Sequence, residues 1–475
     1  MEKFFGLKKH GTTVKTELLA GITTFMAMAY ILMVNAGMFG AMGDEFSSAY
    51  YNAVYIATAL SAVVGTVLIG LLSNLPLAQA SGMGLNAFFV FSVVKGMGFS
   101  YANALVMVLV DGIVFVLLTV TGLRRVIFDA IPKAVKAAIS AGIGLFIAFL
   151  GLQNAGIIVD NASTKVDLHS FNIVFNPYVT WEIIMPMILT ILVVVAIGAM
   201  SKKKVKGAVF WGMIGGAVLY YVLGLATVEG FYETYVKANL NMDVLAPFKD
   251  FANLAFGKVF TEGFNFSAWI SNPENGGVAG FIVTFATTML AFCMVDMFDT
   301  LGTLFGACSV GGLLDQDGNV PNMDKAMLAD AIATCFGAVC GTSTVTTFVE
   351  SSAGVAEGGR TGLSSMFTAV MFLIAMFLAP VAALIPSCAT AAALIYVGIL
   401  MIGGVKNIEW SDPAEAVPAF LTMAMMPFAY NISYGIAFGL ISYIFIKLFT
   451  GKIKEINVGT WIIGVLFTLM FFVAR

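Results

Sequence analysis

The sequence contains few charged residues. Only 11% of its 475 residues are Asp, Glu, Lys or Arg, whereas 60% are hydrophobic and the mean hydropathy is +0.95. A soluble domain carries about 25% charged residues, so this composition excludes an ordinary soluble protein and predicts a polytopic membrane protein. The net charge of −3 gives no indication of nucleic-acid binding, and we expect none.

Histidine and cysteine are scarce as well. His10 and His169 lie outside the apolar runs, which excludes a histidine proton relay within the membrane. The five cysteines fall in or beside apolar segments, and their spacing suggests neither a metal site nor a disulfide framework. Because no nucleophile–base pair is recognisable either, we expect no metal, no cofactor and no enzymatic activity.

The sequence also lacks a phosphate-binding loop of the Gly-x-x-x-x-Gly-Lys-Ser/Thr kind. That motif cradles the phosphates of ATP, so a transporter without it would be driven by an ion gradient. We expect the coupling ion to be H⁺, with Na⁺ as the alternative.

Apolar runs of membrane-spanning length follow one another along the whole chain. Basic residues in the segments 1–16 and Ser201–Lys206, and at Arg124 and Arg125, predict a cytoplasmic N-terminus for a multi-pass protein of the cell membrane. A last apolar run, 461–473, is left over and either spans the membrane or lies at its surface. The fourteen predicted spans are residues 17–39, 52–73, 77–94, 103–121, 137–154, 181–200, 208–227, 279–305, 327–341, 341–362, 363–385, 388–405, 413–429 and 431–449.

Spans 3 and 10 are unusually polar and rich in glycine. Span 10, Gly341–Gly362, has five β-branched residues from Thr342 to Thr347, ahead of Glu350, which favours a short extended piece leading into a half-helix. A polar loop between two spans is the alternative, but the flanking runs place this stretch at membrane depth. Both broken spans are third in a half of seven, and matched broken spans predict an inverted repeat with a binding site at the midplane.

Ionisable residues at membrane depth are costly and usually mark a substrate or ion path. Asp296 and Asp299 are three residues apart on a predicted helix, so both can face one cavity, and Glu350 comes from the facing broken span. Carboxylates sharing one pocket cannot all ionise cheaply, so at least one should hold a proton near neutral pH. The alternatives are a helix-end hydrogen bond for Asp299, a helix cap for Asn86 and an interhelical packing role for Asp111.

Two further charges, Asp330 and Arg360, lie near predicted span ends, where charged side chains reach out to water. We expect structural roles for both.

The acidic residues suggest a ligand that donates hydrogen bonds. A carboxylate accepts two parallel bonds from a planar edge with two donors, as guanine presents, or one bond from hypoxanthine. Phe88 is a candidate for stacking on the base, and Gly84 and Thr344 are candidates for backbone contacts near the half-helix N-termini. A flat heterocycle with N–H donors on one edge, such as a purine, is therefore the candidate ligand.

Four stretches together resemble the nucleobase:cation symporter-2 superfamily, in its AzgA-like branch of hypoxanthine, guanine and adenine permeases. The resemblance covers essentially the whole chain. The stretches are ELLAGITTFMAMAYILMVNAGM (Glu17–Met38), GMGLNAFF (Gly82–Phe89), VDMFDTLGTLFG (Val295–Gly306) and GTSTVTTFVESSAGVAEGGRTGL (Gly341–Leu363).

The resemblance implies a core domain of spans 1–4 and 8–11 and a gate domain of spans 5–7 and 12–14. We thus expect an all-α membrane protein of fourteen spans in a 7+7 inverted repeat, with short strands in spans 3 and 10. The expected divisions are 1–121 (core, first half), 122–227 (gate, first half), 228–277 (outer loop with interfacial helices), 278–386 (core, second half), 387–455 (gate, second half) and 456–475 (an extra apolar segment).

The same resemblance implies that Asp296 and Glu350 bind the base, with Asn86 and Asp299 in support, and that the protein imports purines with protons and often forms a homodimer in the lipid bilayer. Asp111 stands where small residues are common in the family and would add a second titrating group. We favour guanine and hypoxanthine as substrates. The alternatives are an adenine permease and, less favoured because no basic residue is embedded at the site, an anion transporter or channel.

Overall fold

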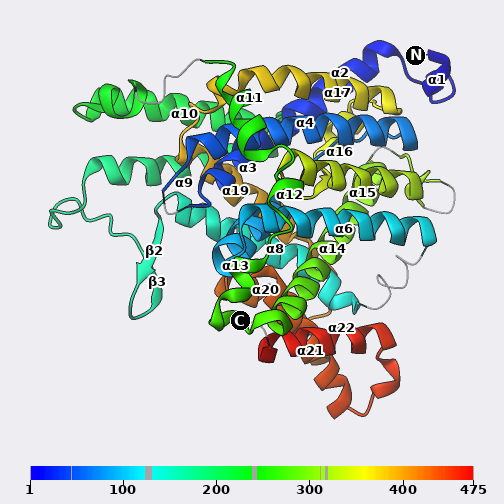
Figure 1. The fold of residues 1–475 in the computed structure, drawn as a ribbon. Helices are drawn as coiled ribbons and strands as arrows, with labels where there is room; N and C mark the ends of the chain where they lie inside the picture. The colour runs from blue at the N-terminus through cyan, green and yellow to red at the C-terminus, as the bar shows by residue number, and fades with distance from the viewer. Residues whose placement is uncertain are drawn as a thin grey trace.

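The computed structural model describes residues 2–43, 45–122, 131–237, 243–310, 312–315 and 319–473; Arg124 and Arg125 lie outside them. Within this part of the chain, ten helical segments are long and apolar enough to cross a membrane. Most run side by side across the view of Figure 1. They are α2 (Val14–Met28) with α3 (Tyr30–Gly40), α4 (Ser48–Ser73), α6 (Tyr101–Thr121), α8 (Lys133–Asn154), α9 (Trp181–Lys202), α10 (Ala208–Thr227), α14 (Gly277–Val310), α17 (Gly362–Ala375) with η6 (Met376–Leu378) and α18 (Ala379–Ala382), α19 (Ser387–Met401) with η7 (Ile402–Asn407), and α21 (Ile432–Phe449).

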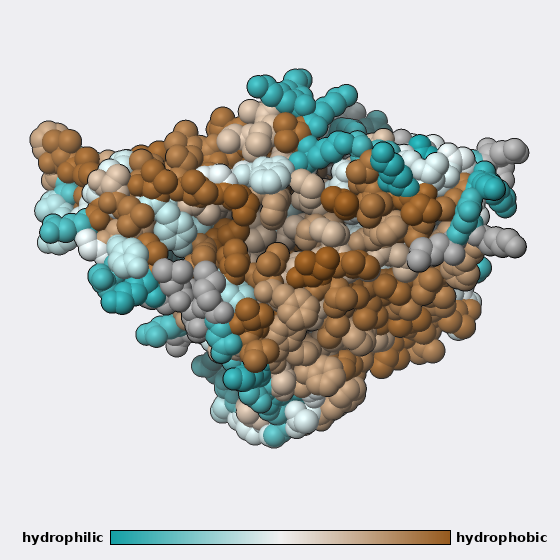
Figure 2. Space-filling model, turned by 90° about the horizontal axis from the view of Figure 1, so that it is seen from above, coloured by the Kyte–Doolittle hydropathy of each residue, from teal (hydrophilic) through white to brown (hydrophobic). Residues whose placement is uncertain are grey.

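The outer surface agrees with a lipid environment. Figure 2 shows apolar side chains over much of the visible face, with polar groups gathered toward its margins. Large apolar residues on α10 such as Leu219, Val222 and Leu225 are about half exposed. Since lipid replaces water around these helices, an apolar exterior is the stable arrangement. The expectation of a polytopic all-helical membrane protein is confirmed.

Three other helices are shorter or less apolar. α15 (Met323–Cys340) carries Asp324, Lys325 and Asp330, and α20 (Pro413–Phe428) contains internal prolines. The apolar run left over at the end of the sequence forms α22 (Val458–Val473), which packs on α14 and α21.

The two broken spans meet in a short antiparallel sheet at the centre of the fold. β1 (Gln79–Ser81) pairs with β4 (Val345–Thr347), and all six residues are buried. The pairing continues on both sides, because Gly82 N donates to Thr344 O at 3.0 Å and Phe348 N donates to Ala78 O at 3.0 Å. Each strand thus gives the other's backbone the partners it needs away from water. The predicted short strands are confirmed.

Helical segments follow both strands directly. After β1 the chain forms α5 (Met83–Ala87) and η1 (Phe88–Gly96), and after β4 it forms α16 (Ser351–Ala356). The first span has a one-residue irregularity that the sequence did not lead us to predict: α2 ends before Ala29 and α3 begins at Tyr30, although the Ala29 N–H still donates to Phe25 O.

Outside the bundle, the described residues between 228 and 276 form short helices, some of which dock on longer ones. α11 (Ala246–Asp250) and η4 (Phe251–Ala255) contact α4, and the Trp269 indole donates to Met97 O at 2.8 Å. These short helices are η2 (Tyr232–Val236), α11 (Ala246–Asp250), η4 (Phe251–Ala255), α12 (Lys258–Thr261), α13 (Ser267–Ser271) and η5 (Pro273–Asn275).

A hairpin between α8 and α9 was not predicted. β2 (Ile158–Asn161) pairs with β3 (Lys165–Leu168), and the Asn161 side chain accepts from Ser163 N and Thr164 N in the turn. The hairpin and the N-terminus lie at opposite ends of the bundle (Figure 1).

Candidate functional site

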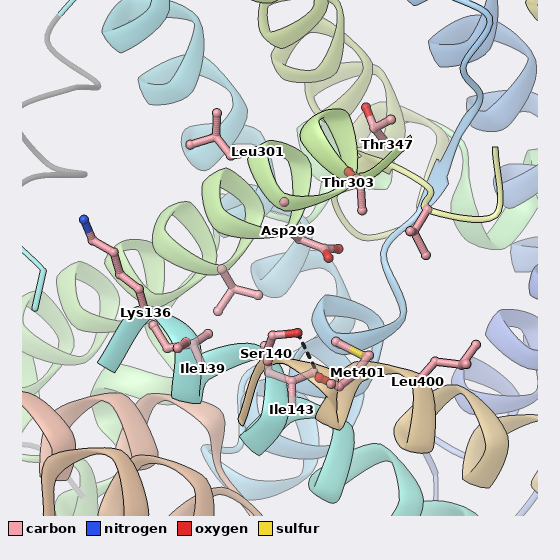
Figure 3. Close-up of a pocket in the computed structure, with 18 of the residues that line it drawn as sticks. Lys136, Ile139, Ser140, Ile143, Asp299, Leu301, Thr303, Thr347, Leu400 and Met401 are labelled. Atoms are coloured by element: carbon pink, nitrogen blue, oxygen red, sulfur yellow. Dashed lines mark hydrogen bonds between the residues drawn. The ribbon is translucent and has the colours of Figure 1, made fainter. Parts of the chain in front are cut away.

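A cavity of about 1360 Å³ lies between the broken spans and the helices α8, α14 and α19. Two carboxylates, Asp299 and Glu350, line the cavity, and so does Tyr30. Lys133 and Lys406 also belong to its lining. Figure 3 shows Asp299 projecting from α14 into this space, across from α8. The cavity has two carboxylates in its wall and a much larger volume than a single flat ring would fill.

Glu350 reaches the cavity because the chain turns sharply after β4. It is the N-cap residue of α16, and two residues separate it from the strand. The Tyr30 hydroxyl donates to Glu350 Oε1 at 2.6 Å. Tyr30 is fully buried and lies at the break between α2 and α3. Two segments far apart in sequence, the first span and the chain after β4, therefore meet at this carboxylate.

Asp299 lies on the same cavity as Glu350. Its Oδ2 accepts from Thr346 Oγ1 of β4 at 3.3 Å, which ties α14 to the central strand pair. The structure thus brings Asp299 and Glu350 together, as the sequence led us to expect.

Asp296 does not line this cavity. It is fully buried, and its Oδ2 accepts from Thr334 Oγ1 of α15 at 3.4 Å. Its Oδ1 has no hydrogen-bond partner among the described residues. The two aspartates of α14 therefore face different neighbours: Asp299 faces the cavity and Asp296 faces α15.

Asn86 connects the two broken spans. Its Nδ2 donates to Ser81 O at 3.3 Å, and its Oδ1 accepts from Ser343 Oγ, just before β4. The side chain is fully buried and is not among the residues that line the cavity. It lies within α5 and does not cap it.

The three remaining candidates have different surroundings. Gly84 lines the cavity. Phe88 is buried away from it, with its ring centroid 4.8 Å from that of Phe292. Thr344 is fully buried; its carbonyl accepts from Gly82 N, and its hydroxyl has no partner in the described part of the chain.

Asp111 is fully buried in α6. Neither of its carboxylate oxygens has a conventional hydrogen-bond donor within the described ranges, although the Cys293 thiol of α14 lies beside it. Since Asp296 is one turn further along α14, Asp111 is close to the same part of the core.

The expectation that Asp330 reaches toward water is wrong. Asp330 is fully buried and accepts from Gln79 Nε2 at 3.0 Å, Thr300 Oγ1 at 2.9 Å and Thr347 Oγ1 at 3.4 Å. It joins α14, α15 and both central strands, because a buried carboxylate requires several donors. Its expected structural role stays a prediction, now for a residue of the core.

Arg360 binds the backbone of its own segment, since its Nη1 donates to Val355 O and Gly359 O at 2.7 Å each. Glu17 was missed. It is fully buried, and its carboxylate accepts from Arg360 N at 3.0 Å and from Ser364 Oγ at 2.5 Å. The sequence signal was available, because Glu17 opens the first apolar run.

Tyr30 was missed as a site residue as well. A tyrosine within an apolar span looks like ordinary packing, and only the tertiary structure places its hydroxyl beside Glu350. Among the residues the structure describes, no three His, Cys, Asp or Glu side chains cluster in a way that could hold a metal ion.

Comparison with protein families gives a match over residues 15–438 to a model described as a permease family. The guanine/hypoxanthine permease PbuG of Bacillus subtilis is 40% identical, with 99% of each chain covered. The adenine permease AdeP of Escherichia coli is 36% identical, over 99% of this chain and 95% of that relative.

Solved structures show the fold. The transmembrane domain of the cyanobacterial bicarbonate transporter BicA has a TM-score of 0.57 and 16% identity, over 88% of this chain and 97% of that one. SLC26A9 has a TM-score of 0.57 and 11% identity, over 92% of this chain and 66% of that one. With full-length relatives at 36–40% identity, the protein is a membrane permease and not an enzyme. The chain belongs to the nucleobase:cation symporter-2 permease family that its four motifs predict.

Proposed function

We propose that this permease imports purine nucleobases together with protons and that guanine and hypoxanthine are its main substrates. The observation that carries the proposal is the pair of carboxylates, Asp299 and Glu350, on one cavity between the broken spans. Two acceptors in a sheltered site suit a flat ring whose edge carries N–H donors. The named functions of full-length relatives, guanine/hypoxanthine and adenine permeases, support a purine substrate.

Within the proposed site, Glu350 binds the donor edge of the base and Asp299 contributes a second acceptor. We retain Asp296 and Asn86 as substrate-binding residues. Asp296 lies one turn from Asp299 on α14 and has an oxygen without a partner among the described residues, and Asn86 links both broken spans. Gly84 is proposed to offer its backbone at the cavity wall.

Proton coupling is proposed to use the same group of acids. The proposed proton carriers are Asp299, which lines the cavity, and Asp111, which is fully buried in α6. Neither carboxylate oxygen of Asp111 has a conventional donor among the described residues, and a buried carboxylate without such a donor is stable only in its neutral form. Na⁺ is the alternative coupling ion.

We further propose fourteen spans in two inverted halves, with a core domain of spans 1–4 and 8–11 and a gate domain of spans 5–7 and 12–14. Two observations support the repeat. The fold is that of BicA, and β1 and β4, from the third span of each half, pair antiparallel. A two-fold axis in the membrane plane would relate two such strands in this way. A homodimer is the proposed assembly.

The cavity is proposed to open to the cytoplasm. Lys133, Lys136 and Lys406 line it, and lysines of short loops favour the cytoplasmic side. The same rule places the N-terminus inside and the β2–β3 hairpin outside. The protein would thus be described in its inward-facing state.

The experiment is uptake of labelled guanine, hypoxanthine, adenine, xanthine and uracil into cells that carry the protein, with and without a protonophore. We expect Glu350→Ala to abolish purine uptake, because the apolar replacement cannot accept a ring N–H. Glu262→Ala is the control, since that exposed acid pairs with Lys258 far from the cavity. Both variants must be present in the membrane in equal amounts.

The same assay separates the alternatives. Preferred uptake of adenine would show that the protein is an adenine permease. Uptake driven by a sodium gradient would show that Na⁺, and not H⁺, is the coupling ion. Uptake of bicarbonate or sulfate but of no base would favour an anion transporter on the shared fold. Unchanged purine uptake in Glu350→Ala would remove Glu350 from the site.

A further inference from the structure

Tyr30 is the one described side chain that donates a hydrogen bond to the Glu350 carboxylate. The bond is 2.6 Å long, both residues line the cavity, and the Tyr30 side chain is fully buried. Hydrogen bonds from a neutral donor to a carboxylate are short and strong. The tyrosine is the first residue of α3, directly after Ala29 in the first span.

The bond uses only Oε1 of Glu350, which leaves Oε2 for a ligand in the cavity. The Tyr30 hydroxyl is the donor in this bond, so it stabilises Glu350 as a carboxylate that accepts. Because the surroundings are largely apolar, a carboxylate without such a donor would be more stable as the neutral acid. Unlike the carboxylate, the neutral acid can donate a hydrogen bond to a ligand.

Purines differ at the edge that such a group would meet. Hypoxanthine presents N1–H, and guanine presents N1–H with its 2-amino group, so both donate to an accepting carboxylate. Adenine presents N1 as an acceptor, which faces the carboxylate's lone pairs. A donor on the protein side would favour adenine at this position, and an acceptor favours the oxopurines.

We propose that Tyr30 is a specificity-determining residue: by donating to Glu350 Oε1 it keeps this carboxylate an acceptor and so selects purines with N1–H over adenine. This inference rests on the proposed function, in which Glu350 binds the base. It assigns to Tyr30 a positioning role that acts through Glu350.

The test is Tyr30→Phe, which removes one hydroxyl and keeps the ring. The inhibition constants of hypoxanthine, guanine and adenine are measured by competition against labelled substrate. We expect both oxopurines to lose about tenfold in affinity relative to adenine, as the loss of one hydrogen bond to a charged group predicts. The matched control is Tyr55→Phe, because that buried hydroxyl donates to Ala375 O at 3.0 Å away from the cavity. In this control, the ratio of the oxopurine inhibition constants to that of adenine should equal the ratio in the unchanged protein.

A merely structural tyrosine would lower transport of all three bases equally or leave the ratio unchanged, and either result would overturn the inference. If Tyr30→Phe does not reach the membrane, Tyr30→Leu makes the same test, because it also lacks the hydroxyl that donates to Glu350 Oε1. The ratio should move the same way, and a constant ratio would again contradict the inference. Absence of purine transport by the unchanged protein would overturn the proposed function and this inference with it.

Discussion

At the residue scale, the site depends on which way each acid of α14 faces. Asp296 and Asp299 are three residues apart, and with about 3.6 residues per turn their side chains point about 60° apart around the helix. At that angle, the two side chains can face one pocket or can contact two different neighbouring elements. In the structure Asp299 faces the cavity and Thr346, and Asp296 faces Thr334.

Asp299→Asn tests the acceptor role of the residue on the cavity. The amide keeps the size of the side chain but removes its charge and half of its accepting oxygens. We expect the KM for hypoxanthine to rise about tenfold, which corresponds to one lost hydrogen bond to a charged group. Uptake kinetics in whole cells measure this.

The control for that experiment is Asp160→Asn in the exposed β2–β3 hairpin, which should leave KM unchanged. An Asp299→Asn variant with normal KM would show that Asp299 only fastens α14 to β4 through Thr346.

At the element scale, helices approach closely where glycine removes the side chain. Gly144 of α8 and Gly398 of α19 face each other, and both helices lie in the proposed gate domain. A Cβ on Gly144 would lie 2.6 Å from Gly398 O and 2.8 Å from Met401 Cβ. Small residues at such crossings are what hold membrane helices together, since lipid gives no hydrophobic drive.

Gly144→Ala should therefore destabilise the protein. We expect a loss of about 1–3 kcal/mol, as for other overpacked sites, seen as a lower Tm in detergent. Gly215→Ala on α10 is the matched control, because nothing lies within 4 Å of its added Cβ. A Tm equal to the control's would show that α8 and α19 can separate slightly without cost.

The strand pair is a second element that packing explains. β1 and β4 are only three residues each, and such short strands are not stable alone. The buried Asp330 carboxylate joins them to α14 and α15 through Gln79, Thr347 and Thr300. A fixed strand pair keeps α5 and α16 in place at the cavity.

At the scale of the whole molecule, the cavity must open to one side of the membrane at a time. Ser140 on α8 lines it, near Lys136, and its hydroxyl donates to Met401 O at 3.4 Å (Figure 3). The lysines predict that this mouth faces the cytoplasm.

Ser140→Cys, in a background without the five native cysteines, should react with a membrane-impermeant maleimide in inside-out vesicles. Guanine or hypoxanthine should slow the reaction, because a bound base fills the cavity. Thr164→Cys at the tip of the β2–β3 hairpin is the control and should react only from outside, in intact cells. Labelling of Ser140→Cys from outside alone would reverse the proposed orientation.

The sequence was sufficient for properties that depend on composition and on local pattern. Scarce charge defined the membrane class, and β-branched residues beside glycine in Gly341–Gly362 predicted the extended piece that β4 confirms. Glu350 could be singled out because an acidic side chain at membrane depth is costly whichever way it points. The family, too, could be predicted from the sequence, because its four motifs are contiguous stretches of residues.

Only the tertiary structure decided which groups meet. It brought Tyr30 to Glu350 across 320 positions of sequence, buried Asp330 among three donors, and turned Asp296 away from the cavity toward α15. The physical reason is that a residue's neighbours depend on the rotation and packing of whole helices, which is a non-local property. A local pattern fixes the depth of a side chain along its own helix, but the partner helices determine the direction in which it finds a hydrogen bond.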